Sequence, residues 1–399
     1  MKWDSKPLNE LGEVARGKSR HRPRDDSKLY GGEYPFIQTA EVKSAEMYIT
    51  AFNQTYNDVG LAQSKLWNAN TLCVTIAANI AESAILSFPA CFPDSIIGFI
   101  PFKNIADVRY VKYCFDILKQ DCKQIAQGAT QDNLSLEKLS TIKFPAPPFS
   151  TQRRIADILS AYDELIENNR RRIKLLEEAA MRLCKEWFVR LRFPGHENAK
   201  IVDGVPDGWR KYQLGEIADI VMGQSPKSDF YNLNSRGLPF HQGVTNYGER
   251  FVENEIYTTE YTRIAAANSI LFSVRAPVGR LNVTKEKIAI GRGLSAINHK
   301  LQLQSFLFYM LKTCFYKDNL IGNGAIFASI TKDDLHKQEF ILPPENLVKQ
   351  YNEFASKLDQ KIEYADMQAK LTQQARDKLL PKLMSGEIEV GDAPIGVPR

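Results

Sequence analysis

LGEVA at Leu11–Ala15 returns as LGEIA at Leu214–Ala218, and each copy stands a few residues after a tryptophan, Trp3 or Trp209. A repeat of this kind decides the architecture, because each copy of a repeated segment is expected to fold as the same structural unit. The 399-residue chain therefore divides into two halves that begin alike.

Further matches follow in the same order along both halves. They are YPFIQ and LPFHQ (Tyr34–Gln38 and Leu238–Gln242), Gly128-Ala129 and Gly324-Ala325, and Pro147-Pro148 and Pro343-Pro344. Each proline pair follows an apolar run and precedes a long polar stretch with helical periodicity. Each half therefore predicts a globular domain, a proline stop and then a helix.

The globular parts have the pattern of mixed α and β structure. Runs of β-branched and aromatic residues bounded by Gly, Asn and Pro predict strands at Thr71–Ile76, Ser95–Ile100 and Ser269–Val274. Apolar spacing compatible with helices occurs at Asp107–Cys122 and Leu303–Tyr316. The fold class expected is α+β, with a mixed α/β domain in each half.

The first polar stretch has a heptad pattern. Its two seam positions are Leu159, Ile166, Ile173, Ala180 and Trp187, and Ile155, Tyr162, Asn169, Leu176 and Leu183. Only Asn169 is polar, and a buried asparagine at a seam can fix helix register at some cost in stability. The pattern predicts a coiled-coil-like helix, whether it packs within one chain or between chains.

The second polar stretch has a weaker version of the same seam. It carries Tyr351, Ala355, Leu358, Ile362, Ala365, Ala369, Leu379 and Leu383, interrupted by Thr372 and Arg376. A helix of this length spans roughly 60 Å, which suits a spacer between two domains. The expected order is a first domain (1–148), a first helix (149–192), a linker (193–206), a second domain (207–344), a second helix (345–386) and a loosely ordered tail (387–399).

Composition fits an ordinary globular protein with a modest basic excess. Hydrophobic residues make up 44% and charged residues 25%, and the formal net charge is +5. The N-terminus has no apolar signal region and no stretch approaches the length of a membrane span, so a cytoplasmic protein is expected. Six cysteines without a CxxC pair and five histidines without ligand spacing predict neither structural zinc nor a disulfide framework.

Several longer strings resemble one known family, the specificity subunits of type I restriction-modification enzymes. The strings are FPDSIIGFIP (Phe92–Pro101), GATQDNL (Gly128–Leu134), EWFVRLRF (Glu186–Phe193), SVRAPVG (Ser273–Gly279), GRGLSAI (Gly291–Ile297) and LLPKLMSGEI (Leu379–Ile388). Together with the two tryptophan and LGE openings, they extend the resemblance over nearly the whole chain.

The resemblance implies two target recognition domains alternating with two long antiparallel helices about a pseudo-twofold axis. It further implies a bipartite double-stranded DNA site, with one half read by each domain. The helices would set the spacing and dock two methyltransferase subunits, which the restriction and translocase subunits then join. The two domains differ greatly in sequence, so unlike half-sites are expected.

Motifs for catalysis are missing. The chain has no GxxxxGK[ST] phosphate loop, and APPF (Ala146–Phe149) and LPPE (Leu342–Glu345) lack the asparagine of an amino-methyltransferase motif. GNG at Gly322–Gly324 is too short for a dinucleotide fingerprint, and EVK at Glu41–Lys43 has no suitably placed PD before it. We therefore expect a non-catalytic chain without metal or cofactor.

Basic residues give the first candidates for DNA contact. The first domain concentrates them in one stretch, at Arg16, Lys18, Arg20, Arg22, Arg24 and Lys28, whereas the equivalent Met222–Tyr231 has only Lys227. Arg275, Arg280 and Arg292 are the other candidates in the second domain. Such side chains can bind phosphates or read guanine. The alternatives are a solvated loop and arginines that support turns.

Polar residues after the matching YPFIQ and LPFHQ segments are candidates for base contact. Gln38, Thr39, His241 and Gln242 have side chains able to hydrogen-bond base edges. Ordinary polar residues at strand ends would give the same pattern.

Two other functions fit the sequence. One is DNA reading for a related modification system in which a single partner both cuts and methylates, and the other is a coiled-coil scaffold that binds no DNA. Apolar residues around Trp187, Phe188 and Leu379–Met384 are expected to be exposed, which would make the chain depend on its partners.

Overall fold

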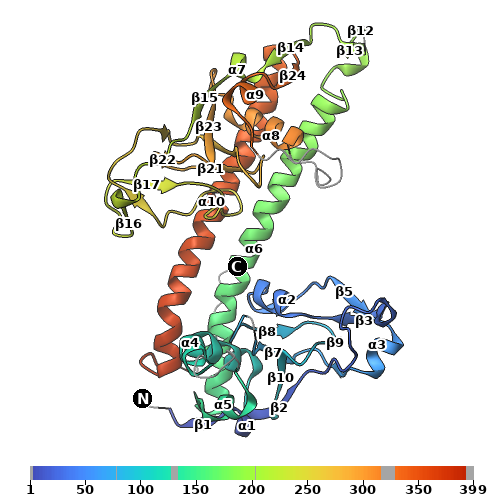
Figure 1. Cartoon of the computed structure of the whole chain (residues 1–399), viewed down its shortest axis with the longest axis vertical. Coiled ribbons are helices and arrows are strands. Elements are labelled where there is room, and N and C mark those ends of the chain that lie inside the picture. Colours follow the sequence, from blue (N-terminus) through green and yellow to red (C-terminus); the bar gives the residue numbers. More distant parts are fainter. Residues whose placement is uncertain (1–2, 78, 127–133, 203, 316–328, 392–399) are drawn as a thin grey trace. The chain divides into compact units, whose positions relative to one another are not determined.

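The computed structural model describes residues 3–77, 79–126, 134–202, 204–315 and 329–391 (Figure 1). The chain forms two compact units, residues 1–170 with 367–399 and residues 171–366. Each unit contains one globular domain and part of both long helices. The domain boundaries expected from the sequence stay a prediction. The paired Gly-Ala steps, most of GATQDNL, the GNG step and the end of the tail lie outside the described residues.

The first domain contains two main sheets and a short strand pair. One sheet has the order β2 (Gly12–Arg16), β10 (Ile96–Pro101), β7 (Leu72–Thr75), β8 (Ser83–Leu86) and β4 (Tyr48–Ile49). The other has β5 (Gln54–Tyr56), β3 (Tyr30–Phe36), β9 (Ala90–Cys91) and β6 (Leu66–Trp67), and β1 (Ser5–Pro7) pairs with β11 (Lys143–Pro145). The helices are α1 (Leu8–Leu11), η1 (Ser27–Leu29), α2 (Thr39–Ser44), α3 (Asp58–Ala62), α4 (Val108–Ala126) and α5 (Leu136–Thr141).

The second domain contains the same kinds of sheet. One has the order β15 (Ala218–Met222), β23 (Leu294–His299), β20 (Ile270–Ser273) and β21 (Leu281–Val283). Another has β16 (Tyr231–Asn232), β18 (Tyr257–Thr258), β17 (Leu238–His241), β22 (Ile288–Ile290) and β19 (Ile264–Ala265), and β14 (Arg210–Gln213) pairs with β24 (Glu339–Leu342). Its helices are α7 (Leu214–Ile217), η4 (Ser228–Phe230), α8 (Gln304–Phe315) and α9 (Lys332–His336).

The internal repeat expected from the sequence is confirmed strand by strand. The order β2-β10-β7-β8 matches β15-β23-β20-β21, and β5-β3-β9-β6 matches β18-β17-β22-β19. Even the parallel pairs correspond, since β3 runs parallel to β9 and β17 parallel to β22. Strands β7, β10 and β20 and helices α4 and α8 also lie where the sequence predicts them. The α+β class with two mixed domains is therefore confirmed.

Burial explains why the central strands are apolar runs rather than alternating ones. All four residues of β7 and of β20 are buried, so both faces of each strand are covered. In the first domain α4 packs its buried face, which includes Tyr110 and Phe115, into the same core as β7.

The long helices are α6 (Phe149–Cys184, 36 residues), continued by the π-helical turn η2 (Lys185–Val189), and α10 (Glu345–Ser385, 41 residues). They run antiparallel in unit 2, where Tyr351 donates to the Ala180 carbonyl and Glu177 and Asp359 meet at one arginine. Most seam residues are buried, namely Leu159, Ile166, Asn169, Ile173, Ala180, Tyr351, Ala355, Ile362, Ala365 and Ala369, whereas Tyr162, Leu176 and Leu358 are half-buried.

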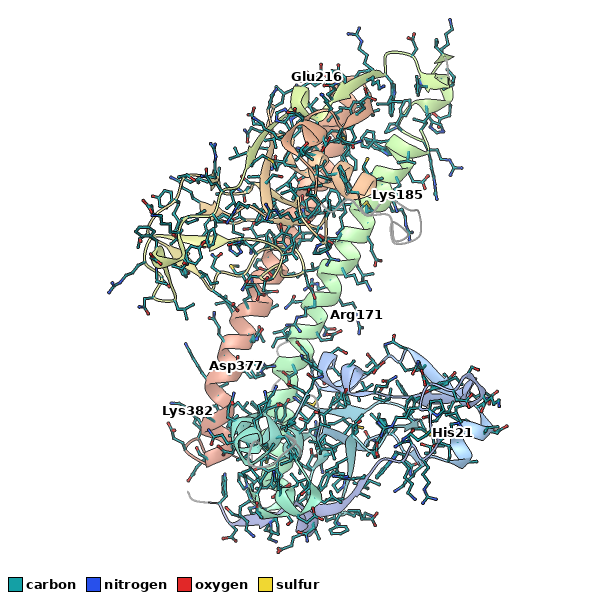
Figure 2. All side chains as sticks on the ribbon, viewed as in Figure 1. His21, Arg171, Lys185, Glu216, Asp377 and Lys382 are labelled. Carbon is teal, nitrogen blue, oxygen red and sulfur yellow. The ribbon has the colours of Figure 1, made fainter. Side chains whose placement is uncertain are left out.

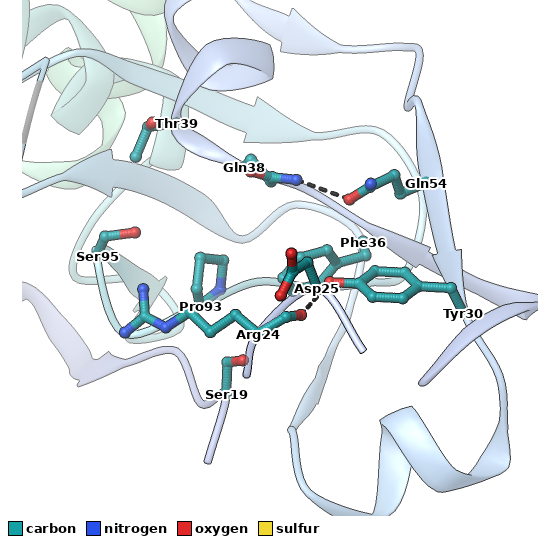
Figure 3. A pocket seen from close by; sticks show the side chains of 10 residues that line it. All are labelled: Ser19, Arg24, Asp25, Tyr30, Phe36, Gln38, Thr39, Gln54, Pro93 and Ser95. Atoms are coloured by element: carbon teal, nitrogen blue, oxygen red, sulfur yellow. Dashed lines mark hydrogen bonds between the residues drawn. The ribbon is translucent and has the colours of Figure 1, made fainter. Parts of the chain in front are cut away.

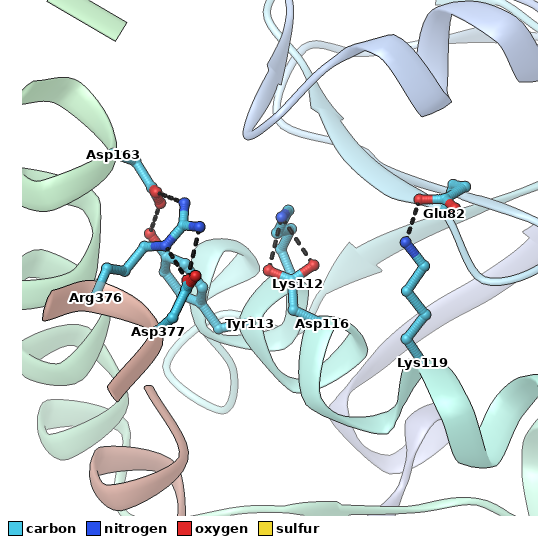
Figure 4. Close-up of polar contacts among 8 residues, drawn as sticks. All are labelled: Glu82, Lys112, Tyr113, Asp116, Lys119, Asp163, Arg376 and Asp377. Carbon is cyan, nitrogen blue, oxygen red and sulfur yellow. Dashed lines mark hydrogen bonds and ion pairs between the residues drawn. The ribbon is translucent and has the colours of Figure 1, made fainter. Parts of the chain in front are cut away.

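Arg376, which interrupts the seam in the sequence, has a partner on the facing helix. It donates to Asp163, and the other oxygen of Asp163 accepts from the Tyr113 hydroxyl of α4 (Figure 4). Unit 2 repeats this arrangement, because the Tyr309 hydroxyl of α8 donates to Asp359 at 2.8 Å. In each unit a tyrosine of the domain therefore donates to an aspartate 50 residues later in the chain, which lies on a long helix, α6 in unit 1 and α10 in unit 2.

Asn169 is the polar seam residue, and it is fully buried. Neither atom of its side-chain amide has a hydrogen-bond partner among the described residues. An unsatisfied buried amide costs about 1–3 kcal/mol. The burial of this seam residue agrees with the sequence pattern, and its cost in stability stays a prediction.

The expected exposure of two apolar segments was wrong in part. Leu383 and Met384 are not exposed, since both lie in the core of the first domain, and Trp187 and Phe188 pack against Tyr351. The chain itself covers Leu383 and Met384, whereas Trp187 and Phe188 are half-buried and Val189 beside them is 61% exposed. Of the expected tail, residues 387–391 are described, and Val390 packs against the first core.

The stretch expected to be a linker has some structure of its own. The strands β12 (Ile201–Val202) and β13 (Val205–Pro206) pair antiparallel after the short 3₁₀ turn η3 (His196–Asn198).

Candidate nucleic-acid interface

The basic loop of the first domain begins where β2 ends at Arg16. Gly17 follows, and its amide donates to the Ile96 carbonyl at 2.9 Å. A Cβ at Gly17 would lie 2.3 Å from the carbonyl oxygen of Phe92, so only glycine lets the loop cross the β9–β10 turn so closely. The loop then runs over the surface, and His21 can be found on it in Figure 2.

The cations of this loop fall into two groups. Arg22 donates to carbonyl groups of its own loop, at Ser19 and His21, and Arg24 forms an ion pair with Asp94 at 2.7 Å. The other group is exposed, and its side chains form no hydrogen bond or ion pair with a described residue. Its members are Arg16, Lys18 and Arg20. These three, together with the exposed Lys28 of η1, are the cations of this stretch that are free to meet phosphates.

A pocket of about 330 Å³ opens beside this loop (Figure 3). Its lining residues are Ser19, Arg24, Asp25, Tyr30, Phe36, Gln38, Thr39, Gln54, Pro93 and Ser95. The structure thus brings together Arg24, Gln38 and Thr39, which the sequence proposed separately. Burial raises the pKa of Tyr30 to about 12, so its hydroxyl stays protonated and donates to the Arg24 carbonyl at 2.7 Å.

Gln38 and Gln54 form an amide pair on one wall of this pocket. The Gln38 Nε2 group donates to Gln54 Oε1 at 2.7 Å, and both side chains are exposed. The backbone amide of Gln38 donates to Glu41 Oε2, which fixes the start of α2. An amide held in this way presents both a donor and an acceptor, as hydrogen bonding to a base edge requires.

The second domain builds the equivalent site from the same backbone contacts. The amide of Gly223 donates to Leu294 at 2.9 Å, as Gly17 does to Ile96, and Val274 donates to Gly293 as Ile76 does to Ser95. These bonds make Ser225 equivalent to Ser19, and Arg292 equivalent to Asp94. The parallel pairs Phe36–Cys91 and Phe240–Ala289 make Gln242 equivalent to Gln38.

Three loops meet at this second site. The Gly293 amide donates to the Gln242 carbonyl at 3.0 Å, and the Arg292 amide donates to Ser225 Oγ at 3.2 Å. The side chains of Gln242 and Arg292 are exposed.

The other candidate cations of the second domain are also exposed. They are Lys227, Arg275 and Arg280. The ladder between β20 and β23 ends at Ser273–Leu294, and the Val274–Gly293 bond continues it by one position. Arg275 and Arg292 occupy the next position, one on each of the two paired segments.

His241 is placed differently from the other candidates, because its side chain is buried. Its Nε2 donates to Asn254 Oδ1 at 2.8 Å, and Asn254 in turn donates to Glu286. Only 3% of the residue is exposed, so in this conformation its ring supports the strand end and leaves Gln242 at the surface.

Acid is expected to destabilise the second domain through His241. Burial lowers the pKa of this histidine below its ordinary 6.5, despite the opposing effects of Asn254 and nearby carboxylates. The folded state therefore takes up a proton less readily than the unfolded chain. The stability this gives is present above pH 6.5 and is lost as the pH falls through the lowered pKa.

This prediction can be checked by measuring the thermal unfolding midpoint from pH 7.5 to 5. His241→Gln keeps a donor for Asn254 and should make the fall in the midpoint smaller. His299, whose pKa burial also lowers, should account for part of what remains. The half-exposed His196 provides the control, since His196→Gln should leave the fall unchanged. An equal fall in all three proteins would place the acid sensitivity elsewhere.

Sequence reasoning missed Gln54, Asp94, Ser95 and Ser225. Ser225 and Ser19 of the first domain follow equivalent glycines after β15 and β2, so the repeat itself was a usable signal. Gln54 and Asp94 lie in parts of the first half that have no matching string in the second.

The model of the family described as type I restriction modification DNA specificity domain matches residues 1–178 and 206–373. The chain belongs to this family. It is the DNA specificity subunit of a type I restriction-modification enzyme. Family membership confirms that the subunit is non-catalytic, because such subunits supply specificity and not the chemistry.

Two relatives from Methanocaldococcus jannaschii are similar to this specificity subunit. The putative type I restriction enzyme MjaX specificity subunit is 34% identical, over 73% of this chain and 70% of its own. The MjaIX specificity subunit is 26% identical, over 97% of this chain and 94% of its own. A crystal structure of a type I restriction-modification S subunit from M. genitalium has the same fold, with a TM-score of 0.60, 16% identity and 96% coverage of both chains.

Within the described residues of the specificity subunit, no helix is both long and apolar enough to cross a membrane. The same residues contain no group of three or more His, Cys, Asp or Glu side chains able to hold a metal ion.

Proposed function

We propose that this specificity subunit directs its enzyme to a bipartite, asymmetric site on double-stranded DNA, each domain reading one half. One observation carries the proposal. In the first domain the loop after β2, the end of β3 and the turn after β9 meet, and in the second domain the loop after β15, the end of β17 and the turn after β22 meet. The backbones of the two sites are equivalent, but their side chains differ. Equivalent backbones would approach DNA in the same way, and different side chains would select different bases.

The exposed cations supply the part of binding that does not depend on sequence. In the first domain Arg16, Lys18 and Arg20 would contact phosphates, and in the second Lys227, Arg275 and Arg280 would do so. The exposed glutamines Gln38 and Gln242 lie at equivalent strand ends of the two sites, where they would meet base edges.

The long helices would set the distance between the half-sites. At 1.5 Å per residue, the 36 residues of α6 extend roughly 54 Å. Half-sites one turn of DNA apart are separated by about 34 Å, so a continuous helix of this length is long enough for the task. Arg376 and Asp163 lock the two helices together within unit 1, which favours a stiff spacer.

Methylome sequencing tests this function directly. A host expressing the chain with its neighbouring methyltransferase should carry methylation at one split motif, and deletion of the chain alone should abolish it. Methylation that persists after the deletion, together with DNA binding that does not depend on sequence, would contradict the proposal.

The helices would also dock two methyltransferase subunits, through which the restriction and translocase subunits join. Met367 and Leu371 lie one turn apart on α10, and these large apolar side chains are 46% and 57% exposed. Exposed apolar side chains that adjoin on a helix are typical of a surface that a partner covers.

Leu371→Asp is therefore expected to reduce co-elution of the methyltransferase in size-exclusion chromatography at least tenfold, because docking would bury the new charge. The control is Gln373→Asp, which places the same charge at another exposed position of the same helix. Equal co-elution of the two variants would exclude this part of α10 from the interface.

A further inference from the structure

The two candidate sites differ most in charge at one equivalent position. The turn after β9 carries Asp94, and the turn after β22 carries Arg292. The position is fixed in each case by two backbone bonds: Ile96 donates to Pro93 and Ile76 to Ser95, while Leu294 donates to Gly291 and Val274 to Gly293. One backbone thus presents an acid in the first domain and a base in the second.

Asp94 already holds the arginine of its pocket. Arg24 Nη2 donates to Asp94 Oδ1 at 2.7 Å, and Asp25 lines the same pocket. An arginine reads guanine by donating two parallel hydrogen bonds to the O6 and N7 acceptors. A carboxylate beside Arg24 competes for those donors and repels the acceptor atoms of guanine. The amide pair of Gln38 and Gln54 is neutral and is not affected in this way.

Arg292 has no such restraint in the second domain. It is exposed, its side chain forms no hydrogen bond or ion pair with a described residue, and Arg275 occupies the next position on the facing strand. An exposed guanidinium that pairs with no described carboxylate favours an acceptor-rich base edge. Guanine is the base that offers two acceptors in the major groove.

We propose that the residue at this turn determines whether a domain reads guanine. Arg292 reads a guanine in the half-site of the second domain, whereas Asp94 withholds Arg24 from guanine in the half-site of the first. The inference rests on the proposed function, because it assumes that each domain reads one half.

The test selects bound sequences from randomised duplexes at fixed salt, using the specificity subunit assembled with its methyltransferase. Arg292→Ala should lower the preference for guanine at one position of one half-site by roughly 5- to 150-fold, as expected for a lost bidentate contact. Arg292→Lys should lower it similarly, because lysine keeps the charge but lacks the fork. The control is Arg236→Ala, which removes an exposed arginine at the other end of β17 and should change no preference.

Asp94→Ala should add a preference for guanine in the other half-site by releasing Arg24. The double variant Asp94→Ala with Arg24→Ala should return that half-site to the wild-type preference. Asp94 and Arg24 are 44% and 47% exposed, so neither change should prevent folding.

The outcomes separate the inference from the function on which it rests. If the wild-type complex selects no split motif, the proposed function fails. If it selects a split motif and Arg292→Ala leaves every preference intact, the inference fails while the function stands. Effects of Asp94→Ala and Arg292→Ala on the same half-site, or no effect of Asp94→Ala, would also overturn the inference.

Discussion

Arg250→Met is expected to lower the free energy of unfolding of the second unit by about 3 kcal/mol. The variant removes the cation of a buried ion pair and leaves its carboxylate partners in place. Arg250 is 4% exposed, and its guanidinium donates to Glu177 of α6 at 3.2 Å and to Asp359 of α10 at 2.8 Å. It also lies 3.3 Å from the ring centre of Phe308 in α8. One side chain of the recognition domain thus contacts three helices.

The loss is large because the acids that remain are poorly placed to reach water. Glu177 keeps Lys312, and Asp359 keeps the Tyr309 hydroxyl, but each loses its shared cation. Urea unfolding followed by fluorescence would measure the change. Lys357→Met breaks an exposed pair with Glu353 on the same helix and should cost less than about 1 kcal/mol. Equal losses for both variants would show that the Arg250 network contributes little.

A triple variant, Arg16→Ala with Lys18→Ala and Arg20→Ala, should bind DNA much more weakly at low salt and depend less on salt. Each phosphate contact contributes about 0.9 to the slope of log affinity against log salt concentration. Loss of three contacts should therefore make the slope shallower by about 2.7. Fluorescence anisotropy of a labelled duplex at several salt concentrations measures both quantities.

A matched triple variant controls for net charge. Lys211, Lys349 and Lys357 each form an exposed ion pair away from the candidate sites. Their replacement by alanine removes the same three charges and should leave the slope within about one unit of the wild type. A slope that falls equally in both variants would mean that only overall charge attracts DNA, and that the basic loop has no special role.

Much of the fold could be predicted from the sequence, because the signals were local or repeated. The LGEVA and LGEIA copies located two equivalent domains, and the fully buried runs of β7 and β20 were legible as strands. The heptad seams located both long helices. Helical and strand periodicity is encoded within a few neighbouring residues, so it survives in a single sequence.

The candidate sites were only half predictable. The basic loop and Gln38 were found as types of residue, but the sequence did not distinguish Arg24, which is paired, from Arg16, Lys18 and Arg20, which are not. The partner of Arg24 is 70 residues away. Similarly, nothing in LPFHQ shows that His241 points inward while Gln242 points outward.

The sequence by itself determined the duplication, the positions of the long helices and the family. Only the tertiary structure decided which cations are free, that Arg376 completes a helix pair, and that Asp94 and Arg292 occupy one equivalent position. The physical reason is that secondary structure and repeats depend on patterns along the chain. The charge state of a surface instead depends on which distant side chains the closed sheets bring within hydrogen-bonding distance.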